Sequence, residues 1–465
     1  MKKHRIEITN GSSIAIIGAG PSGTFFADSA VQWAIKKNLD LNIVLFDGKD
    51  FTQSGPRGCN LCAGVISETL LALLKDRGML LPQEKVQRII KGYCLHGRAG
   101  SYLLTNPKQS SGITTVFRGN GPRQSSPGGN VSFDDYLLQH VRDKGLTVIP
   151  HLVKRIELPQ NHENPVQVIY EVDGQEMVFQ ADLVVGAFGL SEKMMKMAQK
   201  LNFGYRPPRT IQARNMEIQL DRNYISERFG DNIHTYNLST AEGMWVASII
   251  PKKDYVTVNL IGNRDITKDD LSRLSDYLAL DETIPKFWNW SKSFCTCSPR
   301  VATTGAEKPY TNRFIIIGDA SCSRYYKNGI ESAYVTAQLA AEAVFNWGIS
   351  ESALRTRYFK RIKKEIIRDN LYGRILFKIN DFVAGSRFLS EVMLKVAINQ
   401  SRRKKKNHMR EVLWNMYTGN APYKTIFFNF FHPALQWELI AYTSRLIIKR
   451  IVVKLFPHSH HAVGD

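Results

Sequence analysis

Three glycines near the start of the chain have the spacing that phosphate binding requires. Gly18, Gly20 and Gly23 follow four apolar residues and lead into a segment with helical periodicity. In such a unit the first glycine permits a tight turn, the second lets the backbone approach a pyrophosphate, and the third lets helix and strand pack closely. The N–H groups of the first helical turn, around Pro21 and Ser22, would then bind the phosphates.

The elements around these glycines favour a dinucleotide site over a chance glycine-rich helix start. The pattern predicts a buried strand over 14–17, a helix over 24–34 and a second strand over 42–46. The second strand ends at Asp47, where such folds place the carboxylate that bonds a ribose hydroxyl.

Two later pieces of the chain indicate which dinucleotide is bound. An apolar strand ends at Gly318-Asp319, a helix begins at Gly329-Ile330, and a third strand closes in Gly-Ala-x-Gly at Gly189. These pieces resemble the fingerprints of flavoproteins of the p-hydroxybenzoate hydroxylase type. The resemblance implies FAD, with Asp319 on the ribityl chain and the helix at Gly329 and Ile330 pointing at the flavin N1/O2 edge. Reduction places negative charge on that edge, and a helix N-terminus stabilises it.

A narrower resemblance lies in the segment Gly-Cys-Asn-Leu-Cys-Ala-Gly-Val-Ile-Ser at 58–67. It is similar to the segment that follows the second strand in the FAD-dependent geranylgeranyl reductase family, although Val65 replaces a family glycine. The resemblance implies that Cys62 lies beside the isoalloxazine, and that the small Ala63 and Gly64 let the backbone approach the flavin. The stretch 245–251 followed by Gly262 is similar to a hairpin of the same family.

The reaction that follows from this resemblance is hydride transfer from flavin N5 to a C=C bond of a prenyl-type or other lipidic substrate. Cys62, or water near it, is the candidate proton donor. The middle of the chain reads as strands and is expected to hold the substrate, with Tyr205 and Trp245 as candidate substrate residues. Glu217 is expected to face solvent.

The resemblance leaves the phosphate contact and the reductant open. Related flavoenzymes often place an arginine where this chain has Asn130, so the contact must come from Arg57, Arg118 or Arg123. We include Arg57 and Arg123 among the predicted cofactor residues. A second GxGxxG for a stable nicotinamide site is absent from the sequence, which favours transient NAD(P)H or a ferredoxin-like electron donor.

Two other activities on related folds remain as alternatives. One is an FAD-dependent monooxygenase acting on a hydrophobic substrate, and the other is a non-catalytic prenyl-binding escort protein. The stretch 288–290, Trp-Asn-Trp, resembles the start of the flavin halogenase motif, but Ser-Lys follows it where Ile-Pro is needed. Halogenation is therefore not expected.

The cysteines and histidines do not have the spacing of a metal site. Cys59-x-x-Cys62 has no second CxxC to complete zinc ligation, and Cys295-x-Cys297 has the wrong spacing for most zinc ribbons. The His-Ser-His-His stretch at 458–461 reads as a tail. We therefore predict no metal, and interpret six cysteines without a signal peptide as typical of a reducing, cytoplasmic compartment.

The predicted fold class is α/β: a Rossmann-like FAD-binding domain interleaved with an antiparallel β-sheet substrate domain, followed by a C-terminal helical region. The chain has 465 residues, 43% of them apolar, which is enough to bury a large core. The predicted segments are 12–97, 130–200 and 301–346 for the FAD-binding domain, 98–129 for a substrate-side insertion, 201–300 for the substrate domain, and 347–465 for the C-terminal helical, basic region.

The formal net charge of +20 is concentrated late in the chain. The run 402–406 is wholly basic, and Arg445, Lys449, Arg450 and Lys454 alternate with aliphatic residues at helical spacing. This pattern predicts a helix that lies on an anionic membrane surface, with a docked helix with a solvated basic face as the alternative. No run is long and apolar enough to span a bilayer, and no nucleic-acid-binding motif accompanies the charge. The expected location is cytoplasmic and peripheral to the membrane.

Overall fold

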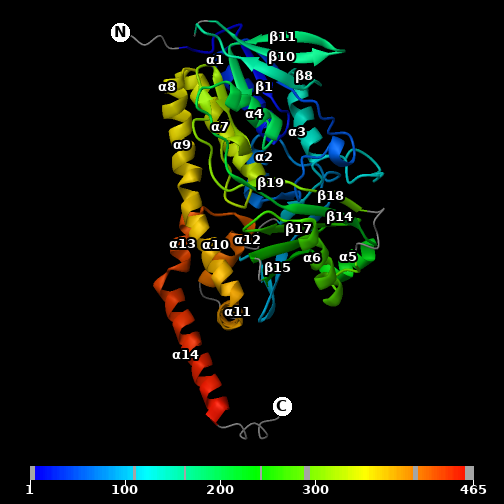
Figure 1. Ribbon diagram of the computed structural model, residues 1–465, viewed down its shortest axis with the longest axis vertical. Helices are drawn as coiled ribbons and strands as arrows, with labels where there is room; N and C mark the ends of the chain where they lie inside the picture. Colours follow the sequence, from blue (N-terminus) through cyan, green and yellow to red (C-terminus); the bar gives the residue numbers. More distant parts are fainter. Residues whose placement is uncertain are drawn as a thin grey trace.

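The computed structural model describes residues 6–107, 112–161, 164–240, 243–286, 294–401 and 407–455 (Figure 1). The basic run 402–406, the stretch 288–290 and the histidine-containing tail at 458–461 lie outside these residues.

The upper part of the molecule in Figure 1 is built on a six-stranded sheet of order β20-β21-β12-β1-β2-β8. All of its neighbouring strands are parallel except β20, which pairs antiparallel with β21. Two apolar clusters cover its two faces, one formed with α1, α3 and α7 and the other with α4 and the sheet β9–β11. The bounds are β1 Ser13–Ile17, α1 Pro21–Lys37, β2 Asn42–Phe46, α2 Glu68–Asp76, α3 Phe133–Arg142, β8 Thr147–Ile149, β9 Val153–Glu157, β10 Val166–Val172, β11 Gln175–Ala181, β12 Leu183–Gly186, α4 Glu192–Lys200, β20 Tyr310–Thr311, β21 Phe314–Ile316 and α7 Gly329–Trp347.

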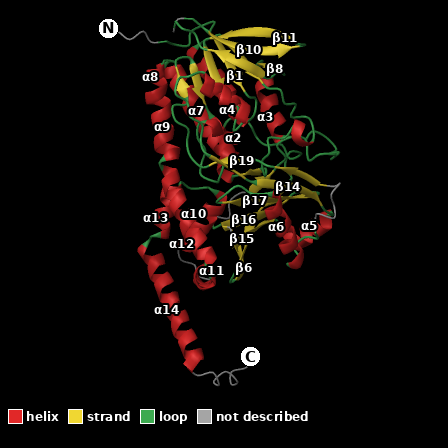
Figure 2. Ribbon diagram, in the orientation of Figure 1, coloured by secondary structure: helices red, strands yellow, loops and turns green. Residues whose placement is uncertain are grey.

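A second, seven-stranded sheet of order β18-β14-β17-β16-β15-β5-β6 lies below the first (Figure 2). It is antiparallel except for the parallel pair β15–β5, and α5 and α6 cover one of its faces. Because β5 belongs to this sheet, the chain leaves the dinucleotide-binding domain before the predicted boundary at 97. The bounds are β5 Gly92–Gly97, β6 Gly100–Thr105, β14 Arg214–Gln219, α5 Arg222–Phe229, β15 Asn232–Thr240, β16 Gly243–Pro251, β17 Tyr255–Gly262, α6 Lys268–Leu280 and β18 Phe294–Cys297; the small sheets contain β3 Val65–Ile66, β4 Arg88–Ile90 and β7 Ile113–Thr115, and β13 Thr210–Gln212 with β19 Arg300–Ala302.

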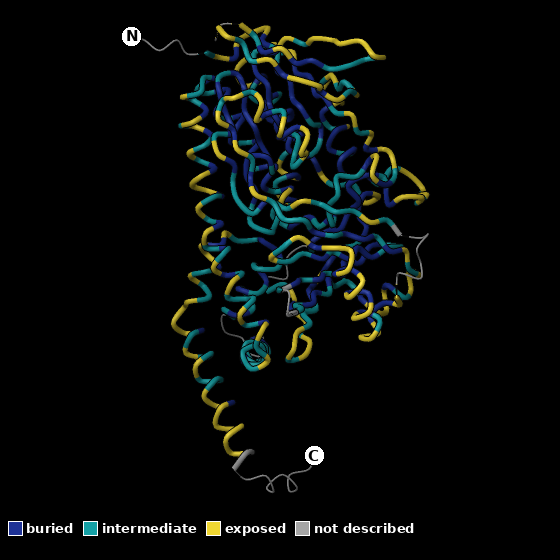
Figure 3. Tube along the Cα trace, viewed as in Figure 1, coloured by how far each residue is buried: buried dark blue, intermediate teal, exposed yellow. Residues whose placement is uncertain are grey.

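The C-terminal region is helical, as predicted, and runs along one side of both sheets before α14 extends beyond the body (Figure 1). Its bounds are α8 Glu351–Ala353, α9 Lys360–Ile362, α10 Asp369–Gly385, α11 Arg387–Ser401, α12 His408–Thr418, α13 Tyr423–Phe430 and α14 Pro433–Leu455, with π-helical turns around α9. The guanidinium of Arg324 donates to the carbonyl groups of Gly419 and Ala421, which ties α12 and α13 to the loop before α7. Figure 3 shows buried chain concentrated in the two sheets and exposed chain along α14. Among the described helices, none combines the length and the apolarity that crossing a membrane would need.

Candidate functional site

The glycine loop between β1 and α1 has the backbone geometry that the sequence predicted. Gly18 has a φ of +105°, and a side-chain carbon there would lie 2.5 Å from the carbonyl oxygen of Ala187. A side-chain carbon at Gly23 would lie 1.9 Å from the carbonyl oxygen of Gly18, so only glycine lets α1 pack this closely. Gly20 has a single neighbour within 4 Å of such a carbon among the described residues, the Asn60 amide at 3.3 Å. The backbone at Gly20 is therefore accessible to a ligand.

The two predicted fingerprints meet at one end of the six-stranded sheet. A side-chain carbon at Gly318 would lie 2.1 Å from the hydroxyl oxygen of Ser22, which follows the buried Pro21 in the first turn of α1. The N–H of Gly318 donates to the Thr336 hydroxyl of α7 at 2.9 Å. Gly189, which follows β12, has a left-handed φ of +54° and open space where a side chain would be. The first turns of α1 and α7 therefore lie at the same edge as the Gly-Asp turn.

Asp319 has a buried carboxylate oxygen, Oδ1, with no hydrogen-bond partner among the residues that the structure describes. Burial raises the pKa of Asp319 to about 6, although the charge of Arg118 and a hydrogen bond from Ser323 act in the opposite direction. The start of α7 is adjacent, because a side-chain carbon at Gly329 would lie 3.6 Å from Oδ1, and Ile330 follows as a buried residue. A ligand hydroxyl group in this space would supply the donor that Oδ1 lacks.

Asp47 lies at the end of β2, as predicted, and its carboxylate holds the glycine loop in place. Oδ2 accepts a hydrogen bond from the Ala19 N–H at 2.8 Å, and Oδ1 accepts one from the Lys49 N–H at 2.9 Å. Burial raises the pKa of Asp47, although these backbone hydrogen bonds favour the ionised form. Its predicted contact with a ribose hydroxyl stays a prediction.

Of the three candidate arginines, Arg118 is the one that lies buried beside Asp319. Its guanidinium makes a two-pronged ion pair with Asp134, with Nε–Oδ1 at 2.5 Å and Nη2–Oδ2 at 2.8 Å. Burial acts to lower the pKa of Arg118, but the charge and hydrogen bonds of Asp134 outweigh it and raise that pKa. Arg57 and Arg123, which the prediction included, have exposed side chains. The sequence signal for Arg118 was the Phe-Asp pair at 133–134, whose aspartate it binds.

The segment that contains Cys62 is fixed between β7 and α7. The Cys62 thiol sulfur accepts a hydrogen bond from the Gly64 N–H at 3.4 Å. Gly64 has a φ of +73°, and a side-chain carbon there would lie 2.0 Å from the carbonyl oxygen of Val116. The Ser67 hydroxyl donates to the Glu331 carboxylate of α7 at 2.8 Å. This hydrogen bond joins the Cys62 segment to the start of α7, although the two residues are 264 positions apart in the sequence.

The sequence analysis expected Glu217 to face solvent, and this expectation is wrong. Glu217 belongs to a buried ion pair next to this segment. Its Oε1 accepts a hydrogen bond from the Lys252 ammonium at 2.8 Å, and the Thr257 hydroxyl donates to both of its oxygens at 2.8 and 3.0 Å. Only 1% of the Lys252 side chain is exposed, and a side-chain carbon at Gly64 would lie 3.8 Å from Nζ. Successive residues of a strand point to opposite faces of the sheet. The apolar residues of β14 occupy the face beneath α5 and α6, so Glu217 lies on the other face.

The two candidate substrate residues also lie elsewhere than predicted. Trp245 is 2% exposed and packs with the apolar residues under α5 and α6, on the face of β16 opposite to Ile250. Tyr205 is buried in the core of the dinucleotide-binding domain, where its hydroxyl donates to the Ala320 carbonyl at 2.8 Å. Alternation along a strand identifies two faces but does not say which one meets a neighbouring domain. The structure therefore gives both side chains a packing role.

An apolar cavity of about 100 Å³ lies between the β5–β6 hairpin, α10, α11 and α12. Leu95 and Tyr102 of its wall belong to an apolar cluster that also includes Ala63 and Val65. The wall of the cavity and the Cys62 segment therefore share one apolar cluster. The other apolar residues that line it include Val383, Ala384, Met393, Leu394, Ala397, Leu413 and Tyr417.

Lys327 is a titratable group that the sequence analysis did not single out. It lies two residues before α7, and its ammonium donates to the Tyr417 carbonyl of α12 at 3.1 Å. Burial, assisted by the charge of Arg324, lowers the pKa of Lys327 to about 8. Tyr326 and Asn328 on either side have left-handed φ values of 58° and 50°, which non-glycine residues rarely adopt and which often mark functional loops.

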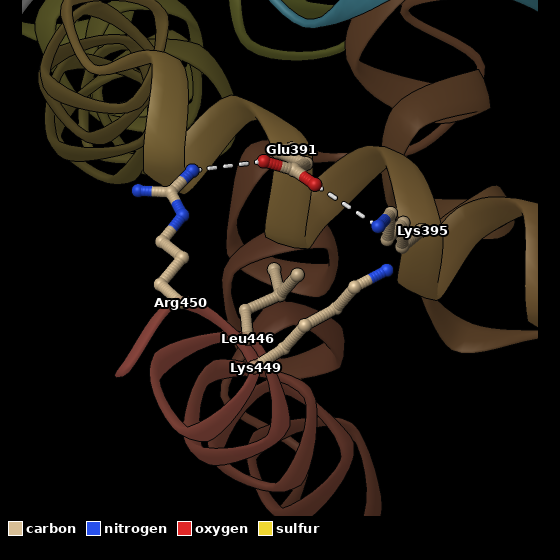
Figure 4. Close-up of a pocket in the computed structure, with 5 residues that line it drawn as sticks. All are labelled: Glu391, Lys395, Leu446, Lys449 and Arg450. Carbon is tan, nitrogen blue, oxygen red and sulfur yellow. Dashed lines mark hydrogen bonds and ion pairs between the residues drawn. The ribbon is translucent and has the colours of Figure 1, made fainter. Parts of the chain in front are cut away.

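The helix α14 presents two different faces. Leu435, Leu439, Tyr442 and Leu446 point toward α11, where the first and last of them are buried. Figure 4 shows Glu391 of α11 paired with Arg450 of α14 at 3.0 Å, which links the two helices, and with Lys395 of its own helix at 2.9 Å. The outward face carries exposed large apolar residues, namely Trp437, Ile440, Ile447, Ile448, Ile451 and Val452.

Comparison with known proteins identifies the fold. No family model and no curated protein matches the chain. Among solved structures, a geranylgeranyl bacteriochlorophyll reductase-like protein from Thermoplasma acidophilum matches with a TM-score of 0.61 at 15% identity, covering 94% of this chain and 100% of that one. A flavoprotein/dehydrogenase from Cytophaga hutchinsonii matches with a TM-score of 0.61 at 12% identity and the same coverage. The p-nitrophenol 4-monooxygenase PnpA from Pseudomonas putida matches with a TM-score of 0.53 at 13% identity, covering 90% and 96%. The chain therefore has the fold of FAD-dependent flavoproteins, as the sequence predicted.

Proposed function

We propose that this protein is an FAD-dependent oxidoreductase that reduces C=C bonds of a prenyl-type or other lipidic substrate. The observation that carries the proposal is the buried carboxylate oxygen of Asp319, which lies beside the first turn of α7 and has no partner among the described residues, together with the open backbone at Gly20. A ligand with a polyhydroxylated chain and a pyrophosphate would satisfy both places, and FAD has both groups. When bound, FAD supplies hydride chemistry to the site.

The residues around this space have distinct roles in the proposal. Asp319 accepts a ribityl hydroxyl, the N–H groups at Gly20 and in the first turn of α1 bind phosphate, and the N-terminus of α7 stabilises negative charge on the bound group. Arg118 supplies a fixed positive charge near Asp319. The absence of a side chain at Gly64 lets the Cys62 segment pack against the Val116 carbonyl, which fixes the position of Cys62.

Reduction of an isolated double bond needs a proton as well as a hydride, and two groups of this chain can hold one. The Cys62 thiol is the candidate from the sequence, and the Lys327 ammonium, whose pKa is lowered to about 8, is a second donor near neutral pH. The electron donor that we propose is NAD(P)H bound transiently, or a ferredoxin-like protein.

The lipidic character of the substrate rests on two apolar features. The cavity of about 100 Å³ beside α10–α12 would hold part of an apolar chain. The exposed apolar face of α14 would bring the protein to the surface of a bilayer, from which a lipid could enter. This arrangement supports a peripheral membrane location on the cytoplasmic side.

The proposed reaction is tested by anaerobic turnover. The purified protein is loaded with FAD, reduced by light, and mixed with a polyprenyl lipid. Reoxidation of the flavin together with a saturated product is the expected result. Reoxidation that occurs only after oxygen is admitted would instead identify a monooxygenase, and lipid binding without any reoxidation would identify an escort protein. A protein that binds no FAD would overturn all three functions.

The role of Cys62 is tested in the same assay. We expect Cys62→Ser to slow formation of the saturated product by roughly 100-fold or more, because a positioned proton donor contributes about that factor. The matched control is Cys295→Ser, which changes a partly exposed cysteine on the second sheet. An unchanged rate in Cys62→Ser would transfer the role of proton donor to Lys327 or to water.

A further inference from the structure

Strand pairing brings a cysteine and two histidines together on two neighbouring interior strands of the seven-stranded sheet, β5 and β15. Cys94 and His96 are two positions apart on β5 and therefore share one face of the strand. The parallel pairing of β5 with β15 places His234 opposite Cys94. One ligand atom from each residue lies within 4.8 Å of the other two. The three side chains are neither fully buried nor fully exposed.

The two imidazole rings each bring one nitrogen to the same place. His96 Nε2 and His234 Nδ1 are hydrogen-bonded at 3.0 Å, close to the roughly 3.3 Å that separates two nitrogen ligands of a tetrahedral zinc ion, so a bound ion would replace this hydrogen bond. The outer nitrogen Nδ1 of His96 bonds the Ser101 hydroxyl at 2.8 Å, and His234 bonds the backbone of Phe229. Ring N–H groups held in this way fix the tautomer and direct the other nitrogen at the metal.

We propose that Cys94, His96 and His234 form a binding site for a zinc-class divalent metal ion. One thiolate and two imidazoles are ligands that Zn²⁺ prefers, and a fourth position remains for water. Binding would displace the thiol proton of Cys94. The opposite face of β5 carries Tyr93 and Leu95, which pack in the apolar cluster next to the cavity. The ion would therefore fix the strand that forms one wall of the proposed substrate cavity.

The test uses the full chain, freed of metal by chelation and prepared without flavin so that protein-bound colour does not interfere. Titration with Co²⁺ is expected to produce one equivalent of a thiolate-to-cobalt charge-transfer band, which Zn²⁺ then abolishes. Cys94→Ser should remove the band, and His234→Gln should weaken Co²⁺ binding at least tenfold. Cys295→Ser, a matched cysteine on β18 of the same sheet, should leave the band unchanged.

Several results would overturn the proposal. One is a wild-type chain that shows no such band, and another is a band that persists in Cys94→Ser. Histidines elsewhere in the chain do not confuse the test, because the charge-transfer band requires a thiolate ligand. If Cys94→Ser and His234→Gln do not fold, as judged by circular dichroism, Ser101→Ala is used instead. Loss of the hydrogen bond to His96 should then weaken Co²⁺ binding about tenfold, and unchanged affinity would count against the site.

Discussion

A buried carboxylate oxygen without a donor destabilises a folded protein, and Asp319 has one. The pKa of this group is about 6 in the folded chain, compared with an ordinary value of 3.8. The folded state therefore holds the proton more tightly than the unfolded state does. Its contribution to stability is complete below pH 3.8 and is lost as the pH rises through 6. A difference of this size corresponds to roughly 3 kcal/mol.

The substitution Asp319→Asn separates the two roles of this residue. In FAD-free protein at pH 8, we expect the variant to be more stable than the wild type by up to about 3 kcal/mol, with the difference vanishing near pH 4. The same variant should bind FAD about 10- to 100-fold more weakly, because a charge-assisted hydrogen bond is lost. Urea unfolding at the two pH values and flavin fluorescence titration measure the two effects. A variant that is weakened in both properties would show that Asp319 is only structural.

The ion pair of Glu217 and Lys252 gives a second prediction at the residue scale. Among the described residues, Lys252→Met leaves Glu217 with only the Thr257 hydroxyl as a partner, and we expect it to lower the free energy of unfolding by about 3 kcal/mol. The double variant Lys252→Met/Glu217→Gln should recover to within about 1 kcal/mol of the wild type, because no uncompensated charge remains. Urea unfolding of both single variants and the double variant measures the coupling. Additive effects would contradict the buried pair and favour the exposed glutamate that the sequence suggested.

The sequence could predict residues whose role depends on local backbone geometry. It could not predict residues whose role depends on which face of a sheet their side chain occupies. Gly18 and Gly23 follow from a local pattern of strand, turn and helix, whereas Asp319 was identified by the resemblance to flavoprotein fingerprints. Trp245 and Glu217 depend on which face of a sheet meets the neighbouring domain, and that is decided by the face on which α5 and α6 pack. The contact between Cys94 and His234 likewise exists only through the parallel pairing of β5 with β15.

At the scale of elements, α14 has an outward face that is apolar and bordered by cations. At about 100° per residue, its exposed apolar residues occupy an arc of roughly 140°. The cations Arg445, Lys449 and Arg450 lie on both sides of that arc, and the opposite face packs on α11 through Leu446. We proposed above that this outward face meets a bilayer surface.

This arrangement predicts binding to anionic vesicles through the outward face of α14. Substituting Trp437→Ser and Ile448→Ser together should weaken co-sedimentation with anionic lipid vesicles at least tenfold, because each large side chain contributes about 1.5–3 kcal/mol on burial. Leu280→Ser, which changes an exposed leucine at the end of α6, is the matched control and should have no effect. Wild-type binding should also fall as salt is raised, since about 1 kcal/mol per cation comes from the anionic surface. Equal sedimentation of the double variant and the wild type would assign the stripe to another partner.

At the scale of the whole molecule, the two sheets are not separate units along the chain. The chain enters the seven-stranded sheet at β5, returns to the first sheet at β8, leaves again for β14–β18 and returns at β20. Arg324, in the loop before α7, binds the carbonyl groups of Gly419 and Ala421 at the junction of α12 and α13. The C-terminal helices therefore pack where the two sheets meet, and this is also where the chain passes from one sheet to the other.

A molecule connected in this way should unfold in one cooperative transition, and FAD should shift that whole transition. At a hundredfold excess over the dissociation constant, a ligand that binds only the folded state adds about 2.7 kcal/mol, which should raise Tm by a few degrees. Differential scanning calorimetry of the FAD-free and FAD-loaded protein measures both the number of transitions and the rise in Tm. In Asp319→Asn, the rise in Tm at the same FAD concentration should be smaller. Two transitions, only one of which moves with FAD, would mean that the second sheet folds without help from the first. The FAD-binding proposal would survive that result, but the cavity beside α10–α12 would then belong to an independent unit, and hydride transfer into it would lose its structural basis.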